Sequence, residues 1–167
     1  MKIRFILVAI CIFIALILPT VANSEKEILE VGQEQKEIPR DISYNEIVQL
    51  TDGFLSTLIQ ETDKDYRVLK YQDKASIIDA FKHITTEDVV KAYVDYYFYE
   101  ENGGLYLVPT ETPPWFNKQN EYDVVQLEKN KFLVKQENES ELYGEYRIEM
   151  EFTYTGQDWK ITKITHL

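Results

Sequence analysis

The clearest helical pattern in the chain lies between residues 43 and 61. Apolar residues recur there at the three- and four-residue spacing of one helical face: Ile47, Leu50, Phe54 and Leu58. Ser43 and Glu46 stand at the start of this segment with the spacing of a capping box, in which each side chain binds a free backbone amide. We therefore expect a helix that begins after Ser43 and runs to about Glu61.

Two shorter helices are expected further along the chain. Asp73 is placed to cap the first of them, whose apolar residues are Ile77, Ile78, Phe81 and Ile84. Thr85, with Asp88 three residues later, marks the start of the second. This last helix should end at 102–104, an Asn-Gly-Gly sequence, because glycine readily adopts the left-handed conformation that closes a helix.

After residue 104 the apolar period changes from helical to alternating, which is typical of strands. Strands are expected over 105–108, 122–128, 131–137, 145–155 and 159–166. Along the fourth strand every second residue is apolar, so one face should be buried and the other wet. In the last strand Ile164 falls out of step with Trp159 and Ile161, which predicts a bulge. The order of elements predicts an α+β fold, with N-terminal helices packed against a curved antiparallel sheet.

The first forty residues have the parts of a secretory signal followed by a polar arm. Lys2 and Arg4 make a basic start, a run of uncharged apolar residues follows, and small residues around Ala22 suit a signal peptidase. As a helix the apolar run spans about 21 Å, less than the bilayer's hydrocarbon core of about 30 Å. We therefore expect cleavage between Ala22 and Asn23, with a second acceptable position after Ser24.

This interpretation divides the chain into a signal peptide over 1–22, a flexible acidic arm over 23–40 and one domain over 41–167. The mature chain would then be secreted or held in the cell envelope, outside the cytoplasmic membrane. The alternative is an uncleaved helix that anchors the domain to the membrane. A lipoprotein is disfavoured, because Cys11 lies inside the apolar run and directly follows Ile10 rather than a small residue.

Composition narrows the chemistry of the mature chain. Cys11 is the only cysteine, so cleavage leaves none, which argues against a disulfide scaffold, a thiol nucleophile and a cysteine-bound zinc. Cleavage also removes two positive charges and no negative one, so the net charge goes from −11 to −13. Such a chain suits a basic protein better than nucleic acid or anionic lipid. Simple solubility of an exported protein is the alternative reason for the charge.

No catalytic, cofactor-binding or metal-binding motif is recognisable. The chain has two histidines, His83 and His166, and a histidine metal site would need both to converge with carboxylates. A calcium loop starting at Asp63 would need glycine at its sixth position and glutamate at its twelfth, where Val68 and Lys74 stand. A Gly-x-Ser-x-Gly nucleophile elbow is also missing from the sequence. We therefore expect no cofactor and no metal.

Aromatic residues are the more informative candidates. Tyr96 and Tyr99 fall on a different side of the third expected helix from the core-facing tyrosines, and Trp115 and Phe116 follow two prolines in a loop. Exposed aromatic residues often mark binding surfaces, so these four residues form the expected binding surface. The alternative is that the tyrosines pack under the sheet and the Trp115 loop.

Three carboxylates beside these tyrosines, those of Asp95, Glu100 and Glu101, would suit acid–base chemistry only in an open apolar cavity.

Four segments together resemble a known family: 93–99, 104–109, 113–116 and the final strand at 159–164. They are similar to exported Gram-positive proteins of uncharacterised function within the NTF2-like superfamily, whose fold is a cystatin-like α+β cone. The resemblance covers about residues 42–167 and implies that fold. It implies no single function, because the superfamily includes isomerases, dehydratases and transport factors. Its enzymes place an Asp/His or Asp/Tyr set inside the cone, and no such set can be matched here.

These observations favour an exported, non-enzymatic binding or regulatory domain that engages a basic envelope or secreted protein. The alternative is a small-molecule binding protein, or a weak carboxylate- and tyrosine-based enzyme, with a cavity inside the cone. A homodimer through the wet face of the sheet is a further expectation.

Overall fold

The structure, a computed structural model, describes residues 41–167. The expected signal peptide over 1–22, its cleavage site between Ala22 and Asn23, and the acidic arm over 23–40 lie outside the described residues. Within the described part of the chain, no helix is both long enough and apolar enough to cross a membrane.

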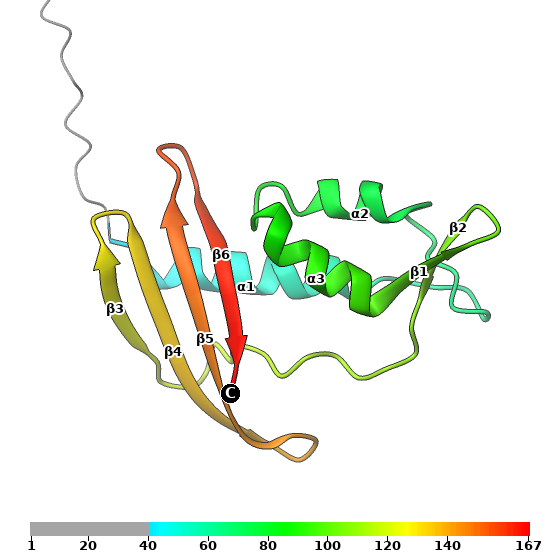
Figure 1. The fold of residues 1–167 in the computed structure, drawn as a ribbon. Helices are drawn as coiled ribbons and strands as arrows, with labels where there is room; N and C mark the ends of the chain where they lie inside the picture. The colour runs from blue at the N-terminus through cyan, green and yellow to red at the C-terminus, as the bar shows by residue number, and fades with distance from the viewer. Residues whose placement is uncertain (1–40) are drawn as a thin grey trace, which may run out of the picture. The chain divides into compact units, whose positions relative to one another are not determined.

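Three helices precede a four-stranded antiparallel sheet, so the expected α+β class and element order are confirmed (Figure 1). The helices are α1 (Tyr44–Leu58), α2 (Lys74–Ala80) and α3 (Glu87–Tyr97). A hairpin follows, made of β1 (Phe98–Glu101) and β2 (Gly104–Leu107). The main sheet contains, side by side in chain order, β3 (Asp123–Glu128), β4 (Lys131–Ser140), β5 (Gly144–Tyr154) and β6 (Trp159–His166).

The helix starts are set by local side-chain caps at two of three positions. Ser43 and Glu46 form the expected capping box at α1, with Ser43 N–H donating to the Glu46 carboxylate at 2.9 Å. Asp73 accepts from Ser76 N–H at 2.7 Å and caps α2. Thr85 does not cap α3: its buried hydroxyl donates instead to the Ile161 carbonyl at 2.7 Å and joins this turn to β6.

The expected end of α3 is wrong, because the chain leaves the helix at Tyr97 and continues as β1. Asn102 and Gly103 form a two-residue turn between β1 and β2, with φ values of 48° and 71°. Two successive residues with positive φ are typical of a type I′ hairpin turn, for which Asn-Gly is a favoured sequence. The same residues that would close a helix therefore close a hairpin here.

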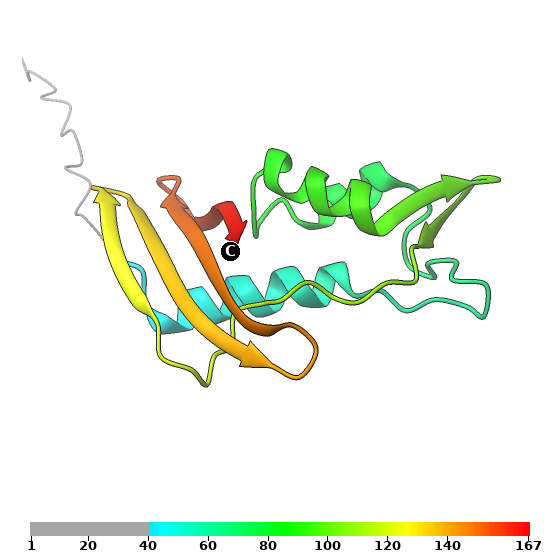
Figure 2. The same cartoon turned by 60° about the horizontal axis from the view of Figure 1, so that its bottom comes forward.

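The core lies between one face of the main sheet and the helices, and both α1 and α3 contact β6 (Figures 1 and 2). Alternating residues of β5 face it, as expected: Ile148, Met150 and Phe152 are buried. The expected bulge in β6 is also confirmed, since the pairing with β5 shifts so that Thr162 is left without a partner residue.

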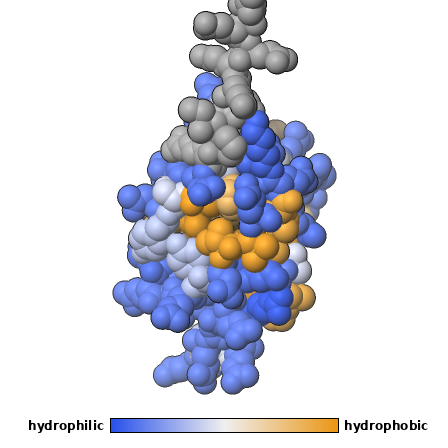
Figure 3. Space-filling view, turned by 90° about the vertical axis from the view of Figure 1, so that its left-hand side faces the viewer, coloured by the Kyte–Doolittle hydropathy of each residue, from blue (hydrophilic) through white to orange (hydrophobic). Residues whose placement is uncertain are grey.

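The other face of the sheet is polar and carries several ion pairs. Lys163 contacts Glu151 at 3.4 Å, Lys131 contacts Glu128 at 3.1 Å, and Arg147 pairs with Glu149. Exposed apolar side chains gather instead along the edge strand β3, where Figure 3 shows an apolar patch. Its exposed members are Val124, Val125 and Leu127.

Candidate binding surface

The structure exposes two of the four expected surface residues. Tyr96 is 64% exposed and Tyr99 is 42% exposed, whereas Trp115 and Phe116 are each only 7% exposed. The expectation that Trp115 and Phe116 contribute to an exposed surface is therefore wrong. Their rings complete the core between the helices and the sheet.

Trp115 is buried because both its aromatic ring and its indole N–H make favourable contacts inside the fold. Its ring stacks on Phe54 of α1 with 5.0 Å between ring centroids. Its indole N–H donates to the Thr51 carbonyl at 3.0 Å, which satisfies the polar end of the side chain. Phe116 packs edge-on against Tyr122 at 5.5 Å.

Neighbouring tyrosine rings support the two exposed tyrosines. Tyr96, in the last turn of α3, packs edge-on against the largely buried Tyr97 with centroids 4.8 Å apart. Tyr99, on β1, stacks on Tyr106 of β2 at 5.4 Å. Since each ring is held by a second ring, the surface is ordered before any partner arrives, which lowers the entropy lost on binding.

Tyr143 adds a residue that sequence reasoning missed. It lies in the turn between β4 and β5, is 38% exposed, and donates its hydroxyl to the Thr112 carbonyl. Burial and then the nearby Tyr143 and Tyr96 phenols raise the pKa of Tyr97 to about 12. Tyr143 and Tyr96 therefore both lie near Tyr97, and the β4–β5 turn continues the surface begun by α3.

Three carboxylates surround the tip of this hairpin. Glu139 and Glu145 face each other directly across β4 and β5, and Glu141 follows in the turn. All three are exposed, and none forms an ion pair with another residue in the range 41–167. Like charges placed directly opposite in an antiparallel pair are destabilising. Beside them Leu142 is 58% exposed, so the tip combines uncompensated negative charge with an apolar side chain.

The carboxylates near Tyr96 and Tyr99 are in a different electrostatic position. Asp95 contacts Lys91 at 2.6 Å and Lys74 at 3.1 Å, and these two lysines lower the pKa of its carboxyl. Glu100 accepts from the Lys74 backbone N–H at 2.7 Å. Asp95, Glu100 and Glu101 are all exposed. They therefore lack the apolar cavity that the acid–base alternative requires.

The two histidines serve different surroundings. His166 lies at the surface, and its Nε2 is 2.8 Å from the Tyr93 hydroxyl. Burial lowers the pKa of His166 and raises the pKa of Tyr93 well above its usual value. His83 is exposed on the connection between α2 and α3. Among residues 41–167, no group of three His, Cys, Asp or Glu side chains is arranged to hold a metal ion.

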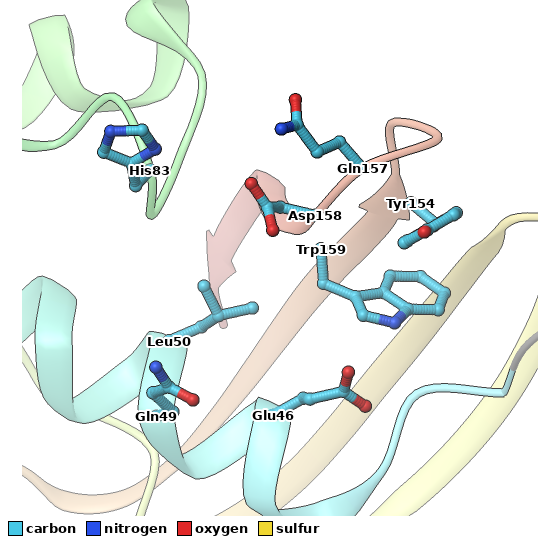
Figure 4. A pocket seen from close by; sticks show the side chains of 8 residues that line it. All are labelled: Glu46, Gln49, Leu50, His83, Tyr154, Gln157, Asp158 and Trp159. Atoms are coloured by element: carbon cyan, nitrogen blue, oxygen red, sulfur yellow. The ribbon is translucent and has the colours of Figure 1, made fainter.

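Large side chains fill the space between helices and sheet. Phe54, Phe81 and Phe152 are fully buried there, together with Trp115. This filling is unfavourable to the alternative of a ligand cavity inside the cone. A separate hollow of about 330 Å³ opens on the surface beside α1, and Figure 4 shows it from close by.

Neither a protein-family model nor a curated protein matches the sequence. The function is therefore inferred from the surface itself: exposed tyrosines at the end of α3 and on β1, joined through Tyr97 to an acidic hairpin tip.

Proposed function

We propose that the protein is an exported, non-enzymatic binding domain that engages a basic protein of the cell envelope or the secreted fraction. The observation that carries this proposal is the β4–β5 tip beside exposed Leu142 and Tyr143. There Glu139, Glu141 and Glu145 have no positive partner among residues 41–167. Keeping Glu139 opposite Glu145 costs stability in the free protein. Lysine or arginine side chains of a partner would relieve that repulsion on binding.

The aromatic residues add a second component to this recognition. Tyrosine offers a large, rigid contact area with a polar end, which is why it is common in protein-binding surfaces. Tyr96, Tyr99 and Tyr143 would supply this contact, while the hairpin carboxylates would steer and orient a basic partner. The absence of a recognised catalytic arrangement in the sequence is consistent with a binding role.

We assign the domain to the NTF2-like superfamily as part of this proposal, with the Gram-positive envelope as its setting. The assignment rests on the resemblance in sequence and on the order of helices followed by an antiparallel sheet. A homodimer through the wet face of the sheet stays a prediction. Its contacts would have to bury ion pairs such as Lys163–Glu151, which carries a desolvation cost.

The decisive experiment compares two variants of equal net charge. The first replaces the hairpin carboxylates (Glu139→Gln, Glu141→Gln, Glu145→Gln), and the control replaces exposed carboxylates elsewhere (Glu61→Gln, Glu87→Gln, Glu111→Gln). Tagged protein over 25–167 captures partners from envelope and secreted extracts at low and high salt, and each captured protein is identified and purified. Its Kd is then measured with all three forms.

We expect a basic partner that is released at high salt. Its affinity should fall about tenfold for the hairpin variant, at about 0.5 kcal/mol for each carboxylate, and should change little for the control. Equal affinities for the two variants, or retention that ignores salt, would show that the hairpin is not the binding surface.

A further inference from the structure

The hollow beside α1 has the make-up of a small-ligand site, distinct from the tyrosine and hairpin surface. It measures about 330 Å³ and lies between α1, the α2–α3 connection and the β5–β6 turn (Figure 4). Leu50, Tyr154 and Trp159 give it apolar walls. The polar groups of its lining come from Glu46, Gln49, His83, Gln157 and Asp158. A few polar groups on an apolar lining, in a space of about 300 Å³ or more, are typical of ligand pockets.

The indole N–H of Trp159 is the unusual feature of this pocket. Trp159 is 4% exposed, and its buried Nε1 has no hydrogen-bond partner in the described part of the chain. Buried donors are nearly always paired, as the indole N–H of Trp115 is with the Thr51 carbonyl. In Figure 4 the Trp159 nitrogen faces the side of the pocket where Glu46 extends from α1. Within residues 41–167, no acceptor in the wall of the pocket therefore bonds this donor.

The polar groups restrict the chemistry of a ligand. The Trp159 indole only donates, whereas the Glu46 and Asp158 carboxylates only accept. The Gln49 and Gln157 amides do both, and the His83 imidazole can donate or accept. A ligand must therefore offer acceptors and donors together, as hydroxyl groups do. An ammonium or guanidinium group offers donors alone and would leave the indole unpaired. An anion would be repelled by Asp158 and by the negative net charge of the chain.

We propose that this pocket binds a neutral, polyhydroxylated ligand of about the size of one sugar ring. A hydroxyl oxygen of the ligand accepts from the Trp159 indole, and further hydroxyls donate to Asp158 and bond to the Gln49 and Gln157 amides. The half-buried Tyr154 ring, 5.4 Å from the Trp159 ring, provides an apolar surface for the C–H groups of the sugar. The proposal does not depend on the protein partner proposed above.

The two tryptophans allow a test with an internal reference. The mature form of the protein is labelled with ¹⁵N, purified and titrated with N-acetylglucosamine. The N–H signals of both indoles are followed by NMR. We expect a saturable shift of the Trp159 signal with a dissociation constant of about 10 mM or tighter, a weak range suited to a small ligand. The Trp115 signal, already bonded inside the core, should stay in place.

Variants separate binding from folding. Asp158→Asn and Gln157→Ala change exposed side chains, and each should weaken the N-acetylglucosamine titration at least fivefold while the Trp115 signal shows an intact core. Glu111→Gln, which changes an exposed carboxylate outside the pocket and outside the hairpin, should leave the titration unchanged.

Two results would overturn the proposal. In the first, the sugar does not shift the Trp159 signal and the indole N–H exchanges with solvent. A bridging water alone would then accept from the indole. The second is a saturable shift with lysine amide and none with the sugar, which would assign the pocket to a basic side chain.

Discussion

At the scale of single residues, polar side chains decide how the loops join the core. Gln136 of β4 is 1% exposed, and both ends of its side-chain amide form hydrogen bonds. Its oxygen accepts from Asn117 N–H at 2.7 Å and from the Asn138 amide at 3.0 Å. Its nitrogen donates to the Asn117 carbonyl at 2.8 Å. These bonds fix the loop that leads from Phe116 into β3, and thereby hold the aromatic segment inward.

His166 makes stability depend on pH. Its pKa in the folded protein lies below the ordinary value of 6.5 because the ring is partly buried. As pH falls through 6.5, the unfolded chain takes up the proton first, so the free energy of unfolding decreases until the folded pKa is passed. Tyr93 stays neutral throughout this range, because burial raises the pKa of its phenol.

We therefore expect His166→Gln, whose amide can still bond the Tyr93 hydroxyl, to remove part of the loss of stability between about pH 6.5 and pH 5. Urea unfolding at several pH values measures this difference. His83→Gln is the control, since it is His166 and not His83 that bonds Tyr93, and it should keep the pH dependence of the unchanged protein. A profile for His166→Gln that matches that of His83→Gln would contradict the explanation.

The structural role of a residue could be predicted where its partners are close in the sequence, and could not where they are distant. Ser43 and Asp73 were predictable as caps because their partners lie three residues away. Trp115 was not, because its burial depends on Phe54 and Thr51, more than sixty residues earlier in the chain. The sequence around Tyr143 did not indicate a place in the proposed surface, because this tyrosine lies near Tyr97 only once the β4–β5 hairpin has packed.

At the scale of elements, the alternation of apolar and polar residues predicted the strands of the main sheet. The Asn102-Gly103 pair, in contrast, was predicted to end a helix and forms a hairpin turn. Period-two patterns are set by burial of one face, so β5 and β6 could be placed to within a residue or two. The pair at 102–103 favours positive φ in helix ends and in hairpins alike. The choice between them was made by pairing of β1 with β2 and of β2 with Arg67, which the local sequence does not show.

Two glycines should respond in opposite directions to alanine. Gly103 has a φ of +71° with open space around a new Cβ, so Gly103→Ala should lower the free energy of unfolding by about 1 kcal/mol through backbone strain alone. Gly53 lies within α1, where a Cβ would make an ordinary contact with Ile84 at 3.5 Å. Gly53→Ala should raise the free energy of unfolding by about 0.8 kcal/mol.

Denaturant unfolding of both variants measures these changes, and the opposite signs are the critical result. A stabilising Gly103→Ala would mean that the β1–β2 turn does not hold this residue at positive φ. A destabilising Gly53→Ala would mean that the space beside Ile84 is tighter than the structure shows.

At the scale of the whole molecule, the fold class followed from element order, whereas the proposed binding surface did not. Helices followed by alternating strands leave few ways to bury one face of each element, so the α+β class was predictable. The surface joins α3 to the β4–β5 hairpin, which are about forty residues apart in the chain. Net charge favoured a basic partner, and only the ion pairs of the structure show which carboxylates have no positive partner within residues 41–167.

The charge of the molecule should control how fast the proposed partner associates. Raising the ionic strength from about 0.01 M to about 0.15 M shortens the Debye length from about 30 Å to about 8 Å. Attraction of a basic partner to an acidic protein then acts only at short range. The association rate constant, followed by stopped-flow fluorescence with the captured partner, should fall at least tenfold over this range, while the dissociation rate changes less.

The hairpin and control variants show whether placement of charge matters beyond its total. Both lose three negative charges, so a purely global attraction would give them the same association rates and the same salt dependence. If the tip at Glu139, Glu141 and Glu145 is where the partner docks, the hairpin variant alone should show the flatter salt dependence. Its dissociation rate should also rise, because contacts formed in the complex are lost. Identical behaviour of the two variants would leave net charge as the whole explanation and remove the hairpin from the site.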